Sequence, residues 1–110
     1  DAMQTLVAYD IGDTRIRNRI ERACRDAGMQ RTQFSAFLGE CNEDRRARLV
    51  ERIASVIEQH ALNEDNDQRE QKLFVQVFPI CAADFAKAVV VSRDLVQAMQ
   101  AVEQPSILVV

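Results

Sequence analysis

The sequence predicts an α+β domain of β-α-β-β-α-β order, the ferredoxin-like sandwich in which two helices cover one face of an antiparallel sheet. Two observations lead to this fold class. Apolar runs with strand composition alternate with two long stretches of helical periodicity. The 110 residues, 47% of them hydrophobic, suffice for one compact domain but not for two. We expect residues 1–91 to form this domain, with residues 92–110 as a C-terminal extension.

The first strand and helix lie before Gly28. The run MQTLVAYDI, residues 3–11, is apolar and predicts a buried strand that ends near Asp10. Asp13 and Thr14 are candidate N-caps. Apolar residues then recur at helical spacing, and Gly28 is a typical helix stop.

The middle of the chain predicts more strand, a second helix and a further strand. Residues 29–41 have strand composition but are too many for one ordinary strand, so we expect two short strands or one bent strand. Asn42 and the acids after it predict the start of a helix that fades near His60. Residues 63–71 contain no apolar side chain and predict a solvated loop. Residues 72–78 predict a strand ended by Pro79.

The C-terminal part carries weaker signals. Residues 88–91 have the composition of a further strand. Ser92 is a candidate cap for a short amphipathic helix, and Pro105 precedes an apolar tail, residues 106–110.

Composition narrows the class of protein. The three cysteines are widely spaced and form no CxxC pair, which argues against a disulfide framework or a zinc site and predicts reduced thiols in a cytoplasmic protein. The sequence contains no run of about 18 apolar residues, so it predicts no membrane span. The net charge is −3, yet twelve of the fourteen basic residues are Arg and ten of these lie in residues 1–52. This distribution indicates a local basic surface on an acidic body.

Asp10 is the leading candidate for chemistry. A carboxylate at the end of an apolar strand must reach solvent, a partner or a metal, because burying it unpaired is costly. It either caps the next helix, or pairs with an arginine, or has a catalytic or metal-binding role. A single carboxylate is a poor Mg²⁺ site, but a two-fold dimer that joins two copies of Asp10 would remove this objection.

Five arginines within eleven residues follow Asp10, namely Arg15, Arg17, Arg19, Arg22 and Arg25. They form either a solvated helix face with scattered ion pairs, or a phosphate-binding surface beside Asp10 that the helix N-terminus would reinforce. Arg31 would extend that surface. Phe34 and Phe37 are more often core residues at such positions, and base stacking is the less common alternative.

Several segments together resemble the Cas2 family of small CRISPR-associated adaptation proteins, whose members carry the name endoribonuclease. They span residues 3–91 and comprise Tyr9-Asp10-Ile11, the basic helix, Gly28, Gln33-x-Ser35-x-Phe37, Gly39-Glu40 and the strand ending Phe78-Pro79-Ile80-Cys81. The resemblance implies a ferredoxin-like homodimer in which a late strand of each subunit completes the other's sheet. It also implies that Asp10 faces its mate and holds Mg²⁺ (or Mn²⁺) as the catalytic and metal-binding residue.

The resemblance further implies a role in spacer acquisition, in which the dimer binds DNA or RNA and bridges integrase subunits. The family positions tied to nucleic-acid binding or activity correspond to Arg15, Arg17, Arg19, Arg31 and Phe37. The apolar tail, with Ile107, Leu108 and Val109, would add a strand to a sheet edge of the dimer or of an integrase subunit. Four functions stay open. They are a metal-dependent endoribonuclease or endodeoxyribonuclease, a non-catalytic DNA-binding adaptor, a toxin-type ribonuclease that shares the fold, and, without a visible ligand motif to favour it, a small-molecule regulatory domain.

Overall fold

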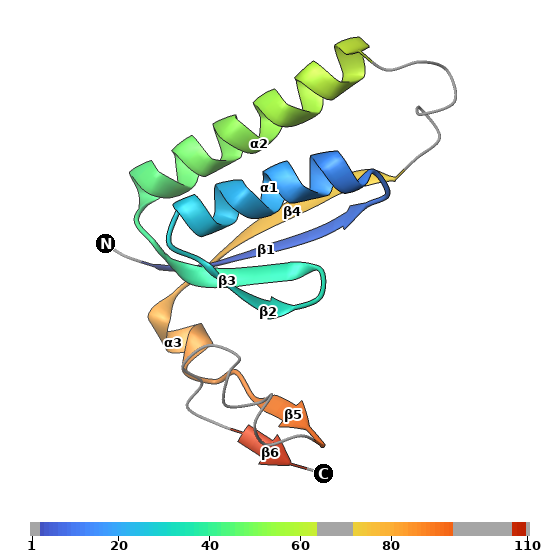
Figure 1. The fold of residues 1–110 in the computed structure, drawn as a ribbon. Helices are drawn as coiled ribbons and strands as arrows, with labels where there is room; N and C mark the ends of the chain where they lie inside the picture. Colours follow the sequence, from blue (N-terminus) through green and yellow to red (C-terminus); the bar gives the residue numbers. More distant parts are fainter. Residues whose placement is uncertain (1–2, 64–71, 94–106, 110) are drawn as a thin grey trace.

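A four-stranded antiparallel sheet, with two helices on one of its faces, forms the body of the protein (Figure 1). The computed structural model describes residues 3–63, 72–93 and 107–109. The first six elements are β1 (Met3–Ile11), α1 (Thr14–Asp26), β2 (Gln30–Gln33), β3 (Ala36–Cys41), α2 (Glu43–Asn63) and β4 (Leu73–Ile80). The strand order β2-β3-β1-β4 and the element order confirm the ferredoxin-like α+β prediction.

Local signals set the limits of α1. The Asp13 carboxylate accepts hydrogen bonds from the backbone N–H groups of Arg15 (2.8 Å) and Ile16 (3.1 Å), so Asp13 is the N-cap. Gly28, just after the helix, has a φ of +85°, a conformation that glycine adopts without strain. Both ends of the helix therefore lie where the sequence predicts them.

The run of residues 29–41 forms two short strands, one of the two predicted outcomes. β2 and β3 pair as an antiparallel hairpin with an irregularity between Arg31 and Gln33, and a turn at Phe34 and Ser35 joins them. The next helix, α2, begins after Asn42, whose side-chain oxygen accepts the N–H of Arg45 (2.7 Å). It continues to Asn63, past the expected end near His60.

Pro79 does not end β4, contrary to the prediction. The strand runs through Pro79 to Ile80, and Pro79 lies opposite Thr5 of β1. In the four-stranded sheet β4 is an outer strand, paired with β1 alone. An outer strand tolerates a residue without an N–H, because one of its edges makes no ladder hydrogen bonds.

The core lies between the sheet and the two helices. Alternate residues of β1 point into it, with Val7, Tyr9 and Ile11 all buried. The helices contribute mainly aliphatic side chains, among them Ile16, Ile20, Leu49, Ile53 and Val56. Cys24 and Cys41 are buried and free, whereas Cys81 is exposed. Burial raises the pKa of the Cys24 thiol to about 12, so the thiol stays protonated at neutral pH.

The second face of the sheet is only partly covered by described residues. This face carries the alternate residues of β1 that do not point into the core. In the pairing with β4, Asp10 lies opposite Phe74 and Leu6 lies opposite Phe78. Phe74 and Phe78 are exposed. The short helix α3 (Ala82–Phe85) follows β4 and lies below the sheet in Figure 1. Phe85 lines a hollow with Gln4, at the far end of β1 from Asp10, and with residues of β2 and β3.

The last described strands form a separate two-stranded sheet. β5 (Val90–Ser92) pairs in parallel with β6 (Ile107–Val109). β5 lies close to the predicted strand at residues 88–91. The amphipathic helix predicted after Ser92 lies outside the described residues. Within the described ranges, no helix has both the length and the apolar character needed to cross a membrane.

Candidate functional site

Asp10 projects from the sheet face opposite to the helices. Its neighbours Tyr9 and Ile11 point into the core beneath the helices, so strand alternation places the carboxylate on the other side. The side chain is 62% exposed, and its Oδ2 atom lies 3.4 Å from the Nζ atom of Lys72. The prediction that this carboxylate reaches solvent or a partner therefore agrees with its position.

One chain brings a single carboxylate to this place. Among residues 3–63, 72–93 and 107–109, no three His, Cys, Asp or Glu side chains cluster closely enough to hold a metal ion. Lys72 is 75% exposed, and such surface ion pairs contribute at most about 1 kcal/mol. Asp10 is thus accessible and weakly held.

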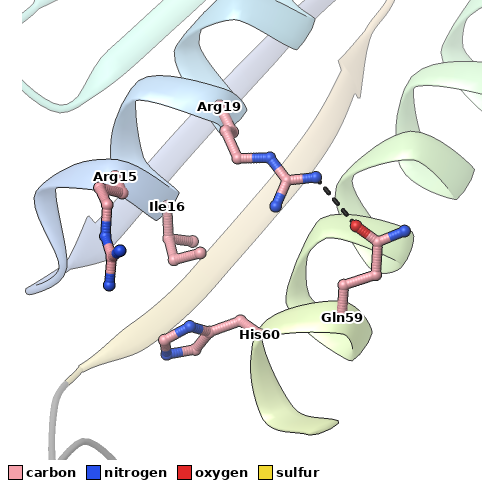
Figure 2. A pocket seen from close by; sticks show the side chains of 5 residues that line it. All are labelled: Arg15, Ile16, Arg19, Gln59 and His60. Atoms are coloured by element: carbon pink, nitrogen blue, oxygen red, sulfur yellow. Dashed lines mark hydrogen bonds between the residues drawn. The ribbon is translucent and has the colours of Figure 1, made fainter. Parts of the chain in front are cut away.

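The arginines of α1 fall on different sides of the helix. Arg19 extends towards Gln59 of α2, and Arg15 lines the same hollow as His60 (Figure 2). Nη2 of Arg19 donates a hydrogen bond to Oε1 of Gln59 (2.9 Å). Arg17 turns the other way and donates to the carbonyl oxygen of Ile11 (3.4 Å). The expected single basic surface beside Asp10 is therefore divided between two faces of α1.

The N-terminus of α1 is occupied by the protein's own anion. Asp13 accepts two N–H groups of the first turn, and these bonds, led by that from Ile16, lower the pKa of its carboxyl group. The amide groups expected to reinforce phosphate binding are thus partly satisfied already.

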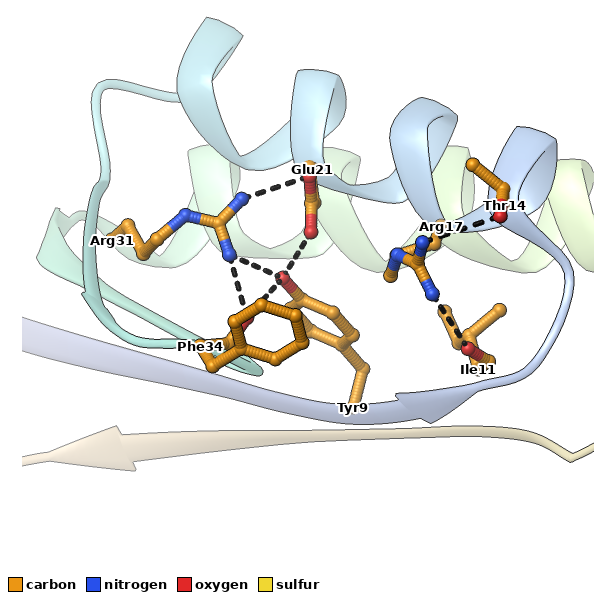
Figure 3. A network of polar contacts seen from close by, with 7 residues as sticks. All are labelled: Tyr9, Ile11, Thr14, Arg17, Glu21, Arg31 and Phe34. Atoms are coloured by element: carbon orange, nitrogen blue, oxygen red, sulfur yellow. Dashed lines mark hydrogen bonds and ion pairs between the residues drawn. The ribbon is translucent and has the colours of Figure 1, made fainter.

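Arg31 lies in a network between α1 and the β2–β3 turn (Figure 3). Its Nη2 atom is 2.8 Å from Oε1 of Glu21, and its Nη1 atom donates to the hydroxyl of Tyr9 (3.3 Å) and to the carbonyl oxygen of Phe34 (2.5 Å). The Tyr9 hydroxyl donates to Oε2 of Glu21 (2.5 Å). Burial, followed by the Glu21 hydrogen bond, raises the pKa of Tyr9 to about 12. Arg31 therefore connects the turn to α1, and much of its hydrogen-bonding capacity is used inside the protein.

Phe37 belongs to the core, the more common of the two alternatives that the sequence offers, and its burial argues against base stacking on its ring. Its side chain is fully buried, its ring stacks near that of Tyr9, and the guanidinium groups of Arg25 and Arg31 lie over it at 5.4 and 5.1 Å. A base cannot stack on a ring that is enclosed in this way. By contrast, Phe34 at the β2–β3 turn is 81% exposed.

Two residues of these networks have no local sequence signal. Lys72 meets Asp10 because β4 pairs with β1, and the N–H of Gly12 donates to the Lys72 carbonyl oxygen (2.8 Å). Glu21 is buried only because Tyr9 and Arg31 satisfy its carboxylate. Both contacts join residues that are far apart in the chain.

The predicted partner-binding residues Ile107, Leu108 and Val109 form β6. Their backbone pairs in parallel with β5 of the same chain. A partner on this sheet stays a prediction.

The sequence of this chain is similar to a family model and to several known proteins. The family model described as "CRISPR associated protein Cas2" matches residues 3–88. A CRISPR-associated endoribonuclease Cas2 of Desulforudis audaxviator is 33% identical over 95 residues, which cover 84% of this chain and 79% of that protein. The Archaeoglobus fulgidus protein named CRISPR-associated endoribonuclease Cas2 1 is 30% identical, over 86% of this chain and 89% of its own length. A Chloroflexus aurantiacus protein, CRISPR-associated endoribonuclease Cas2 2, is 41% identical over 61 residues, 56% of this chain and 72% of that protein.

Proposed function

Because the chain belongs to the CRISPR-associated protein Cas2 family, we propose that it is an endonuclease of CRISPR adaptation that hydrolyses phosphodiester bonds as a homodimer. The observation that carries this proposal is the position of Asp10. Its carboxylate is exposed at one end of a partly apolar sheet face that the described residues cover only in part. A second copy of the chain on this face, related by a two-fold axis that passes near Asp10, would bring two Asp10 carboxylates together.

The composition of the face supports a second copy as its occupant. Phe74 is 56% exposed and Phe78 43%, and both project from the face that carries Asp10. Exposed aromatic side chains on one sheet face are typical of a surface that is buried in an assembly. Two sheets stacked face to face cover such side chains in the manner of a sandwich.

One chain supplies one of the two carboxylate ligands that a magnesium site between two subunits would have. Mg²⁺ prefers six oxygen ligands, usually one or two carboxylates with water and phosphate oxygens. Asp10 from each subunit would supply two carboxylates, so the residues fit Mg²⁺ or Mn²⁺ only as a pair. When bound, the ion would activate water and offset negative charge on the phosphate.

Lys72 has two consequences for this site. Its ammonium group lies 3.4 Å from the Asp10 carboxylate and competes with a cation for it. Once it is displaced, the same group is free to bind a phosphate oxygen of the substrate, as a flexible point charge.

The experiment replaces Asp10 by Asn and measures Mg²⁺-dependent cleavage of labelled RNA and DNA. We expect Asp10→Asn to abolish cleavage with the fold and dimer unchanged, whereas Asp44→Asn, an exposed acid of α2, leaves it intact. Phe74→Ser should separate the dimer in size-exclusion chromatography and abolish cleavage as well. Cleavage by Asp10→Asn at the unmodified rate would refute the assignment.

A non-catalytic adaptor that bridges integrase subunits is the second candidate, and the two-stranded β5–β6 sheet favours it. A two-stranded sheet has outer edges to which a further strand can add. Deleting residues 105–110 removes β6. Loss of integrase binding with an intact dimer would support the adaptor, as would spacer integration that survives Asp10→Asn.

A further inference from the structure

We propose that the ring of Phe34, at the β2–β3 turn, is a platform on which an unpaired base of the substrate stacks, so that the nuclease site prefers a strand with unpaired bases to an intact duplex. This inference rests on the proposed function for its substrate and assigns the preference to one side chain. Among the residues that the structure describes, Phe34 is the most exposed of the large apolar side chains, at 81%.

The turn that carries Phe34 lies beside the end of β1. The backbone N–H of Tyr9 donates to the carbonyl oxygen of Ser35 (3.0 Å), so the turn contacts the residue that precedes Asp10. The pairing of β1 with β3 ends at Ala8, and the turn adjoins the part of β1 that continues beyond it. A strand bound with a phosphate at Asp10 therefore meets this turn as it crosses the edge of β1.

The backbone of the turn is fixed although the ring is exposed. Nη1 of Arg31 donates to the carbonyl oxygen of Phe34 (2.5 Å), and Nη2 of the same guanidinium group lies 2.8 Å from Oε1 of Glu21 (Figure 3). Together with the hydrogen bond between Tyr9 and Ser35, these contacts anchor the turn to α1 and β1. A ring on an anchored turn is preorganised, so little conformational freedom is lost when a ligand covers it.

The surroundings of the ring favour a base over a partner protein. Gln33 and Ser35, on either side of Phe34, are exposed and polar. In the described ranges, the other exposed large apolar side chains belong to α2, to β4 and to residues 89–91, so Phe34 is not part of an apolar patch. A protein interface has a packed core of several residues, whereas a base stacks on a single ring.

Stacking on Phe34 requires a base whose face is free. In a duplex both faces of each base are covered by its neighbours, and turning a base out of the stack is costly. In a single strand, a bulge or a frayed end, a face is available without that cost. Every base has a π-face, so we expect a preference for unpaired nucleotides and only a weak preference among the bases.

The first test measures binding of two labelled single strands of equal length that differ only in their bases. One carries adenine throughout and the other has abasic sites in its central part, so both present the same phosphate charge. Fluorescence anisotropy in EDTA keeps the strands uncleaved. The variants are Phe34→Ala, Phe34→Leu and Phe34→Trp, and Val50→Ala, which alters an exposed apolar residue of α2, is the matched control.

We expect Phe34→Ala to bind the adenine strand about 5- to 150-fold more weakly, the range that base stacking on an aromatic side chain provides. Binding of the abasic strand and of a duplex should not change, and neither should the dependence on salt, because no phosphate contact is lost. Phe34→Leu restores apolar surface without a π-face and should resemble Phe34→Ala. Phe34→Trp should keep the affinity, and the adenine strand should quench the fluorescence of this tryptophan, since the chain has no other.

Several outcomes would overturn the proposal. Phe34→Ala would then weaken binding of the adenine and abasic strands equally, or leave both unchanged. Full affinity of Phe34→Leu would show an apolar contact and not a stack, and an equal loss in Val50→Ala would show an effect unrelated to the turn. Separation of the dimer by Phe34→Ala in size-exclusion chromatography would place the ring in a subunit interface. Thermal unfolding of each variant checks that the fold is kept.

A second measurement links the ring to the cleavage site and separates this proposal from the proposed function. Single strands with one abasic site, placed at successive positions, are cleaved with Mg²⁺ by the unmodified chain and by Phe34→Ala. We expect one abasic position, at a fixed offset from the cut bond, to slow the unmodified chain and not Phe34→Ala. Cleavage without any such position would overturn the link to the site. Absence of cleavage by the unmodified chain would count against the nuclease alone, because base-dependent binding in EDTA does not require it.

Discussion

Tyr9 offers a direct measurement of the network that joins α1 to the β2–β3 turn. It is the only tyrosine of the chain, which has no tryptophan, so the near-ultraviolet absorbance of phenolate follows Tyr9 alone. Burial and the hydrogen bond to Glu21 raise its pKa to about 12, whereas in the unfolded chain it should lie near 10. We expect a titration midpoint near 12 in buffer and near 10 in concentrated urea.

The same shift predicts how stability changes with pH. The pKa of Tyr9 is higher in the folded than in the unfolded chain. The contribution of Tyr9 to the unfolding free energy is therefore fully present below about pH 10 and is lost as the pH rises towards 12. Two pKa units correspond to about 2.7 kcal/mol. Tyr9→Phe removes this titration, so the difference in unfolding free energy between the unmodified chain and Tyr9→Phe should shrink by up to about 2.7 kcal/mol across that window.

Urea unfolding followed by circular dichroism, from pH 8 upwards, gives both unfolding free energies. Glu21→Gln provides a second check, because it removes the charge that disfavours the phenolate and should lower the Tyr9 pKa. A midpoint near 10 in the folded chain would refute the reasoning. So would an alkaline loss of stability that is the same with and without the Tyr9 hydroxyl.

Three further predictions follow from side chains and backbone described above. Lys72→Gln should lower the Mg²⁺ concentration for half-maximal cleavage by up to about 5-fold, since an exposed ion pair with Asp10 is worth at most about 1 kcal/mol; a higher requirement would contradict the competition. Phe37→Ala should cost about 3 to 5 kcal/mol in urea unfolding, and Phe34→Ala less than about 0.5 kcal/mol; similar losses would contradict their placement. Gly28→Ala should cost about 1 to 2 kcal/mol, because its φ is +85°, and an unchanged melting temperature would argue against that conformation.

The elements that local chemistry specifies were predictable. The side chain of Asp13 caps the start of α1, and the backbone of Gly28 allows the chain to leave its end. The side chain of Asn42 caps the start of α2 as Asp13 caps that of α1. Pro79 was misjudged because its effect depends on whether its strand is an outer one, and strand order is a property of the whole sheet. The four-residue helix α3 is too short to show a periodic pattern.

The candidate site was predictable only in part. The position of Asp10 at the end of an apolar strand indicated an accessible carboxylate, and the structure places it so. Helical periodicity separates Arg17 from Arg15 and Arg19, but which side meets α2 depends on how the helices pack. The burial of Phe37 likewise depends on the hairpin that folds over it.

The outer strand β4 also bears on aggregation of the chain. Its residues Leu73–Phe78 are uncharged, rich in β-branched and aromatic side chains, and lie at a sheet edge, a combination typical of segments that form intermolecular β-structure. The charge of Lys72 precedes this segment, and Pro79, which has no N–H to donate, follows it. Charged residues and prolines at such flanks act as gatekeepers that oppose further strand pairing. The proline inside the strand thus opposes pairing of this edge with strands of other chains.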